Sequence, residues 1–149
     1  MKTSKVKIFV ILLLSLTIIF AFIHWNTIEP IAEGTLLISI GDEAVTVDIS
    51  KFDYEQVTGI RMNGKGEEII VDALGISLKD ILEQEDIQNY KKVVVFSKDS
   101  YNAEILAEEV EMDSKVFLIV EEEKELRLVV FGDTNSKRSV SNVVQIVVE

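Results

Sequence analysis

Apolar residues along this chain fall into one long uncharged run followed by a series of short segments. The run covers residues 8–23, sixteen positions without a charged side chain. After it, apolar stretches four to six residues long are separated by clusters of glycine, serine and acidic residues. Stretches of this length bounded by turn-forming residues are typical of β-strands. We therefore expect about eight strands: Thr35–Ile40, Ala44–Ile49, Glu67–Val71, Val93–Phe96, Tyr101–Ile105, Val116–Val120, Leu126–Phe131 and Val143–Val148.

One segment has the spacing of a helix instead. Ser77 is a good N-cap for a helix whose third residue is Asp80, and Gly75 allows a tight or left-handed backbone just before the cap. The apolar residues that follow helical spacing are Ile76, Leu78, Ile81 and Leu82. This pattern predicts a short amphipathic helix with one face toward a core.

The remaining segments are expected to be short helical turns and loops. One turn of helix is expected over Ser50–Gln56, capped by Ser50, and another over Leu106–Val110. Thr58–Gly66 contains three glycines and is interpreted as a loop, as is the polar stretch Gly132–Asn142. The fold class is therefore α+β, with mostly-β mixed sheets and one or two short helices.

The long apolar run is interpreted as a membrane anchor over residues 8–25. Lys2, Lys5 and Lys7 precede it, and no basic residue follows until Lys51, so the positive-inside rule places residues 1–7 in the cytoplasm. Residues 26–34 then form a linker, and residues 35–149 form a domain outside the membrane. A cleaved signal peptide is the alternative, although Ala21-Phe22-Ile23 matches a cleavage site poorly.

The charge and the cysteine content limit the ligands and partners that this chain can bind. The chain has no cysteine, which excludes disulfides and thiolate metal ligands. After residue 28 it has 12 basic and 26 acidic residues, a net charge of −14, which disfavours nucleic acid as a partner. This charge serves solubility, or it meets a basic partner or cations. The acidic group Glu108, Glu109, Glu111 and Asp113 is either a solvated face or a calcium site, and it lacks the pattern of an EF-hand loop.

Four short motifs, in order, resemble the oxidoreductase molybdopterin-binding domain, the fold of sulfite oxidase and its bacterial relatives. Gly75–Leu82 resembles the family's Gly-Val-x-Leu-x-Asp-Leu-Leu segment, and Ser97–Tyr101 its Ser-x-Asp-Gly-Tyr turn, with Ser100 where the family often has glycine. Leu126–Val129 is similar to the Leu-Arg-Leu-Val strand, and Ser139–Val148 to the closing segment. The resemblance covers residues 35–149 and implies a sulfite oxidase-like fold.

The chain departs from that family at the residues that carry its chemistry. Catalytic members bind molybdenum through a cysteine before the helix, and this chain has none. Glu123-Lys124-Glu125 replaces the Gly-Gly-Pro that precedes the Leu-Arg strand, and carboxylates are poor ligands for a pterin phosphate. Ser139 and Ser141 replace the closing tryptophan and lysine. The resemblance therefore implies an inherited fold without molybdenum catalysis.

The candidate binding residues are Arg61, Asp99, Tyr101 and Arg127. The family's turn lies near its cofactor side, so these four residues are expected to form a small polar pocket. The competing interpretation gives Asp99 an Asx-turn and packs the Tyr101 ring on the sheet edge. It pairs Arg127 with a glutamate of a neighbouring strand. It also treats the Arg61 segment as an ordinary turn.

The sequence thus predicts a membrane-anchored extracytoplasmic binding or interaction domain. No residue is singled out as catalytic or as a metal ligand, and His24, the only histidine, lies at the expected membrane edge. No cofactor is expected, with molybdopterin implied only by the resemblance. The expected partners are the membrane, a small ligand and an envelope protein. The alternatives are a molybdopterin-dependent oxidoreductase or redox subunit that retains the cofactor, and a purely structural envelope component.

Overall fold

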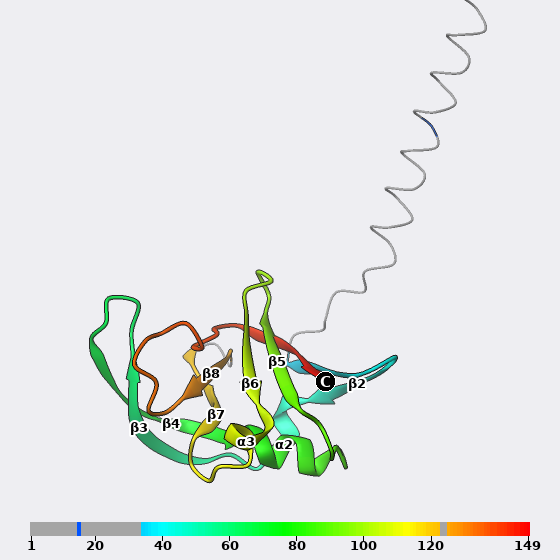
Figure 1. Ribbon diagram of the computed structural model, residues 1–149, viewed down its shortest axis with the longest axis horizontal. Coiled ribbons are helices and arrows are strands. Elements are labelled where there is room, and N and C mark those ends of the chain that lie inside the picture. The colour runs from blue at the N-terminus through cyan, green and yellow to red at the C-terminus, as the bar shows by residue number, and fades with distance from the viewer. Residues whose placement is uncertain (1–14, 16–33, 123–124) are drawn as a thin grey trace, which may run out of the picture. The chain divides into compact units, whose positions relative to one another are not determined.

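The computed structural model describes residue 15 and residues 34–122 and 125–149 (Figure 1). The chain divides into two compact units, Met1–Pro30 and Ile31–Glu149, and the second one is described below. The anchor expected over residues 8–25 lies outside the described residues except for Ser15. No helix within the described ranges is long and apolar enough to cross a membrane.

A five-stranded mixed sheet forms one layer of the domain, with strand order β2-β1-β9-β5-β6. The strands β1 and β9 are parallel, and the other neighbours are antiparallel. Antiparallel hairpins therefore form both ends of this sheet, β1–β2 at one and β5–β6 at the other. The strands are β1 Thr35–Ile40, β2 Glu43–Asp48, β5 Lys92–Ser97, β6 Asn102–Leu106 and β9 Val143–Val148.

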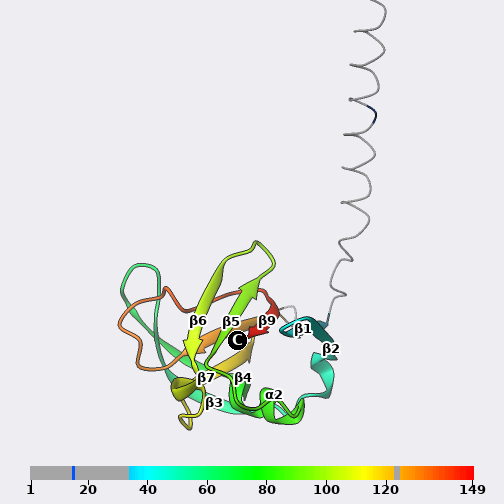
Figure 2. The ribbon, with the colours of Figure 1, turned by 45° about the vertical axis from the view of Figure 1, so that its right-hand side comes forward.

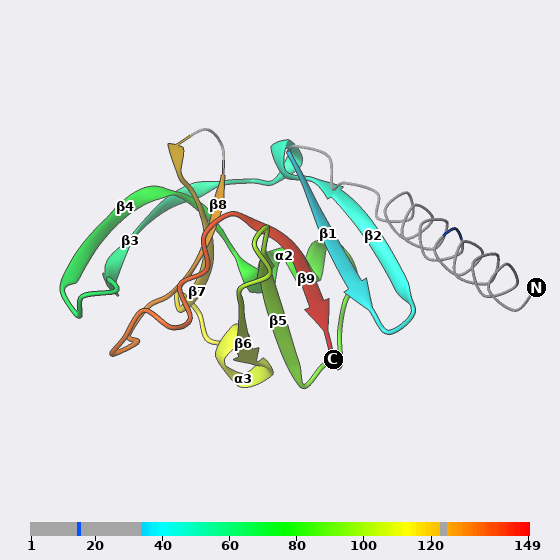
Figure 3. The same ribbon diagram turned by 90° about the horizontal axis from the view of Figure 1, so that it is seen from above.

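A four-stranded antiparallel sheet forms the second layer, with strand order β3-β4-β7-β8. Its strands are β3 Glu55–Met62, β4 Glu68–Ser77, β7 Val116–Val120 and β8 Leu126–Val130. The strand β4 pairs with β7 only from Gly75 to Ser77. The rest of the β3–β4 hairpin runs past β7 and curves away from the five-stranded sheet (Figures 1 and 3).

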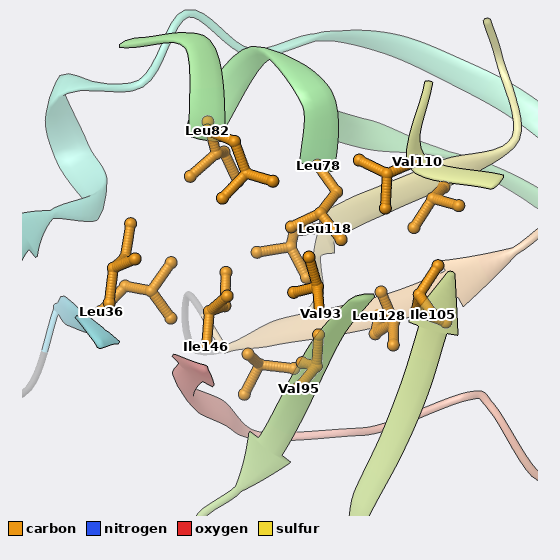
Figure 4. Close-up of a cluster of buried hydrophobic side chains, with 14 of the residues drawn as sticks. Leu36, Leu78, Leu82, Val93, Val95, Ile105, Val110, Leu118, Leu128 and Ile146 are labelled. Carbon is orange, nitrogen blue, oxygen red and sulfur yellow. The ribbon is translucent and has the colours of Figure 1, made fainter. Parts of the chain in front are cut away.

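The main core lies between the two sheets and is closed by short helices. Figure 4 shows its side chains converging from both sheets, from α2 (Leu78–Gln84) and from α3 (Ala107–Val110). Leu36, Leu118 and Ile146 are completely buried there. Burial of each such side chain stabilises the domain by about 1.5–3 kcal/mol. The apolar stretches that predicted strands therefore supply the buried side chains of this core.

The expected helix is confirmed, with a correction at its start. The Ser77 hydroxyl oxygen accepts a hydrogen bond from the Asp80 backbone nitrogen at 3.0 Å, and α2 lies against β4 and β7 (Figure 2). Gly75 and Ile76, however, belong to β4. Gly75 does not supply a left-handed turn; a Cβ there would lie 3.0 Å from Val57 and 3.1 Å from Ile119, so the position needs a small residue.

The prediction of a loop over Thr58–Gly66 is wrong for the first half of that range. β3 continues to Met62, so the described residues contain nine strands, one more than the eight expected. Gly59 lies in β3 and has no room for a side chain, because the ring of Phe131 lies against it and an added Cβ would meet that ring at 2.5 Å. The turn is confined to the residues around Asn63, whose side-chain oxygen accepts bonds from the Lys65 and Glu67 backbone nitrogens.

The helical turn after β2 is shorter than expected. A 3-10 turn, η1, spans Ile49–Lys51 and is capped by Asp48 rather than Ser50. The Asp48 carboxylate accepts a hydrogen bond from the Ser50 backbone nitrogen at 2.9 Å. Phe52 is buried as expected. The shorter turn leaves Glu55 and Gln56 free to begin β3.

A second, smaller apolar cluster lies on the other face of the four-stranded sheet. We call it the hairpin cluster, because the curved β3–β4 hairpin covers β7 and β8 there. The Phe117 and Phe131 rings pack in it with centroids 5.8 Å apart. Its members are Val57, Val71, Ala73, Phe117, Ile119, Val129 and Phe131. The hairpin cluster therefore packs the inner face of β3 and β4 against β7 and β8.

Candidate functional site

Arg61 lies near the end of β3, on the face of the hairpin that carries the hairpin cluster. It is directly opposite Ile69 on β4, and alternation places it on the same face as Val57 and Gly59. The side chain is half-buried. Because β3 is a strand here, a regular backbone holds Arg61 instead of the flexible loop that the sequence suggested.

Arg127 lies in β8 opposite Ile119, and its guanidinium is already engaged. Its Nε is 2.6 Å from Oε1 of Glu121, and its Nη1 donates to the Ser139 hydroxyl at 3.3 Å. Glu121 follows β7 directly, so this is the pair with a neighbouring strand's glutamate that the sequence left open. The pairing fixes the orientation of Arg127 but leaves Nη2 without a hydrogen bond among the described residues.

Arg127 lies close enough to Arg61 to affect its ionisation. Partial burial lowers the pKa of Arg61, the positive charge of Arg127 lowers it further, and Glu121 opposes both effects. Within the described ranges, no hydrogen bond or ion pair is made by the Arg61 side chain. The site therefore has two guanidinium groups and one paired carboxylate. Its unused N–H groups are the donors that a carboxylate or phosphate oxygen binds.

Asp99 belongs to the β5–β6 turn and does not join the arginines. Its carboxylate accepts hydrogen bonds from the Ser97 hydroxyl and, at 3.3 Å, from the Tyr101 backbone nitrogen. The bond from Ser97 is the main cause of the lowered pKa of Asp99. Ser100 has a φ of 69°, which explains why glycine would be accepted at this position. These contacts match the Asx-turn interpretation rather than the pocket.

Tyr101 is tied to the long loop between β8 and β9. Its ring is half-exposed, and its hydroxyl donates to the Lys137 carbonyl oxygen at 2.6 Å. Two residues further along the same loop, Ser139 accepts a hydrogen bond from Arg127. The four predicted residues thus lie in two places: Arg61 and Arg127 form one site, and Asp99 and Tyr101 belong to the β5–β6 turn. The β8–β9 loop contacts both places through Ser139 and Lys137.

A second arginine site, which the sequence did not predict, is centred on Arg138. Its guanidinium Nη1 is 2.6 Å from Oε2 of Glu109 on α3, and it also binds both oxygens of Asp133. Lys115 reaches the other oxygen of Glu109 at 3.0 Å. The hydrogen bond from Arg138 lowers the pKa of Glu109 to about 2. No local pattern marks Arg138, because its partners lie on different elements.

Two carboxylates of the acidic group around α3 have partners through this and neighbouring contacts. Glu109 is bound by Arg138 and Lys115, while Glu111 accepts a hydrogen bond from the Tyr90 hydroxyl at 2.8 Å and lies 3.7 Å from Lys79. Among the residues that the structure describes, no group of three or more His, Cys, Asp or Glu side chains is arranged to hold a metal ion.

Comparison with known proteins does not assign a family. No protein-family model matches the sequence, and no curated protein matches it. The class of protein is therefore defined by the fold alone: a mostly-β α+β domain of two sheets with short helices.

Proposed function

We propose that this chain is a membrane-anchored extracytoplasmic binding module that uses a molybdopterin-binding-like fold to bind a small oxyanion without molybdenum catalysis. The observation that carries the proposal is Arg61, a half-buried arginine beside a second arginine, whose side chain makes no hydrogen bond or ion pair within the described residues. An oxyanion bound there would supply the missing acceptor for Arg61 and would also reach Nη2 of Arg127.

The energetics of a half-buried guanidinium favour a bound anion. Partial removal of Arg61 from water weakens its hydration, and Arg127 repels it. A carboxylate or phosphate oxygen replaces the lost hydration with charge-assisted hydrogen bonds, which are about twice as strong as neutral ones. Glu121 holds Arg127 in a fixed orientation, so part of the ordering cost is met before the anion binds.

The residues around the site suit a simple anion better than a molybdopterin. The chain has no cysteine to bind molybdenum. Glu125 ends the turn before β8, where a pterin phosphate would need hydrogen-bond donors, and a carboxylate supplies none. The proposed fold is supported by the motif order and by the left-handed Ser100 where the family often has glycine.

The proposed location rests on the sequence of the first 34 residues. The apolar run preceded by Lys2, Lys5 and Lys7 supports an anchor over residues 8–25 with the N-terminus in the cytoplasm. The binding domain would then face the envelope, where its oxyanion is a free metabolite or a carboxylate of an envelope protein.

A thermal-stability screen of the full chain against small anions tests this proposal. Acetate, succinate, phosphate and sulfate are compared at equal ionic strength, and a saturable rise in Tm identifies the preferred anion. The Arg61→Met variant should lose the rise, while the matched control Lys91→Met, at an exposed lysine that ends the α2–β5 connection, should keep it. An equal response in both variants would contradict the proposed site.

Metal and pterin content separates the proposal from the alternative oxidoreductase. The chain is produced in a host that makes molybdopterin, and molybdenum is measured by mass spectrometry beside pterin fluorescence. We expect neither in stoichiometric amount. Stoichiometric molybdenum would instead favour a cofactor-dependent redox protein and would call for assays with oxo-substrates.

A further inference from the structure

The two faces of the β3–β4 hairpin differ in what covers them. The inner face packs against β7 and β8 through the hairpin cluster. The opposite face, which we call the outer hairpin face, carries every second residue of the two strands. It consists of Gln56, Thr58, Ile60, Met62, Glu68, Ile70, Asp72 and Leu74.

Three large aliphatic side chains on the outer hairpin face are exposed. Ile70 is 80% exposed, and Ile60, its direct cross-strand partner, is 50% exposed. Leu74 is 52% exposed and lies four residues, about 13 Å, from Ile70 along the strand. Exposed aliphatic side chains gathered on one face are typical of an interaction surface.

The outer hairpin face is a continuation of the main core. Ile76 follows Leu74 on the same face of β4, and Ile76 is buried against the core while Leu74 is exposed. The change occurs where β4 leaves its pairing with β7 at Gly75 and curves away (Figure 3). A partner bound to the outer hairpin face would therefore extend the apolar layer of the main core along β4.

The charges on this face select the kind of partner. Glu68 and Asp72 are its charged residues, and both are exposed. With a net charge of −14 after residue 28, a second copy of the domain or an anionic membrane would be repelled. We propose that the outer hairpin face docks a partner protein whose contact surface combines aliphatic side chains with lysine or arginine. Apolar contact supplies the affinity, and Glu68 and Asp72 supply the selection for positive charge.

A defined peptide probe tests the charge and the location of this surface together. The probe is a short peptide that alternates lysine and valine, and its matched control alternates glutamate and valine. The full chain, held in nanodiscs of zwitterionic phosphatidylcholine, is titrated while isoleucine and leucine methyl signals are followed by NMR. We expect saturable shifts at Ile60, Ile70 and Leu74 with the basic peptide only, weakening as salt is raised.

Two serine variants separate docking from folding. Ile70→Ser should weaken binding of the basic peptide at least about tenfold, because it removes the most exposed aliphatic side chain of the apolar contact without changing the charge of the face. Val45→Ser is the matched control, since Val45 is 46% exposed on β2 of the other sheet, and it should leave binding unchanged. The urea midpoint of each variant checks that the domain remains folded.

Several outcomes would overturn the proposal. Equal binding of the acidic peptide would show that charge does not select the partner. Concentration-dependent broadening of the same methyl signals without peptide would identify a second copy as the occupant. Shifts induced by phosphatidylserine in the nanodisc would identify the membrane, and shifts elsewhere on the domain would remove the outer hairpin face from the site.

Discussion

Arg138 and Arg61 are both half-buried, yet their surroundings are opposite. Arg138 binds carboxylates from two separate segments, Glu109 on α3 and Asp133 in the loop after β8. The charges that act on Arg61 are those of Arg127 and Glu121, and Glu121 is already paired with Arg127. Accordingly, the hydrogen bond to Asp133 raises the pKa of Arg138, whereas burial lowers that of Arg61.

This difference separates an arginine that holds the fold together from one that is available to a ligand. Removal of Arg138 leaves Asp133 without its cationic partner and Glu109 with Lys115 alone, and it releases the loop from α3. Removal of Arg61 takes away a charge that has no internal partner among the described residues. Stability should therefore depend on Arg138 and ligand binding on Arg61, and the predictions below test this separation from the largest expected effect to the smallest.

Arg138→Met should destabilise the domain by about 2 kcal/mol. The loss is the cost of leaving Asp133 without Arg138 and Glu109 with Lys115 alone, when their side chains are only 15% and 17% exposed, and it is reduced from the value for a fully buried pair. The loss is measured by urea unfolding, with far-UV circular dichroism as the signal. Arg61→Met is the matched substitution, and an equal loss in both variants would break the comparison.

Glu109→Gln should reduce stability at neutral pH by about 1–2 kcal/mol, and the loss should vanish in acid. The folded-state pKa of Glu109 is lowered from 4.5 to about 2, chiefly by the Arg138 hydrogen bond. A lowered pKa contributes stability that is complete above pH 4.5 and is lost as the pH falls toward 2. The difference between wild type and variant is measured by urea unfolding across this range. A difference that does not change with pH would contradict the ion pair.

Tyr101→Phe should cost about 0.5–1 kcal/mol. It removes the hydrogen bond from the Tyr101 hydroxyl to the Lys137 carbonyl but leaves the ring in place, and water can replace the donor because the site is exposed. The urea midpoint measures the effect, and amide hydrogen exchange shows whether the Gly132–Asn142 loop opens more often. A loss larger than that of Arg138→Met would mean that Tyr101, rather than the ion pairs, holds the loop.

Arg61→Met should change the free energy of unfolding by less than about 0.5 kcal/mol, with a small gain favoured. The substitution removes repulsion from Arg127 and keeps an apolar stem of similar length over the hairpin. The change is measured by urea unfolding in a buffer that contains none of the screened oxyanions. A loss above about 1 kcal/mol would reveal a stabilising partner and would remove the argument for a ligand.

The sequence predicted elements whose pattern is local. The strand Val93–Phe96 and the helix capped by Ser77 depend on neighbours within a few positions, and both are found. β3 was missed because Gly59 was counted as a loop signal. Position 59 needs glycine because the ring of Phe131 packs against it. Phe131 lies far along the chain, so this contact could not be predicted from the local pattern.

The candidate site was predictable only in part for the same reason. Arg127 and Glu121 flank one turn, so the pairing of this arginine with a neighbouring glutamate followed from alternation. The proximity of Arg61 to Arg127 depends on the curvature of the hairpin. Asp99 was grouped with them by resemblance, yet its hydrogen bonds stay within its own turn.

The most direct test of the difference between the two arginines follows their side-chain Nε–H signals by ¹⁵N NMR during titration with the anion that raises Tm most. Signals are assigned with the Arg61→Met and Arg138→Met variants. We predict a saturable shift of the Arg61 signal, a smaller one for Arg127 and no shift for Arg138. Equal and non-saturating shifts of all three, or no shift of Arg61, would contradict the assignment of Arg61 to ligand binding.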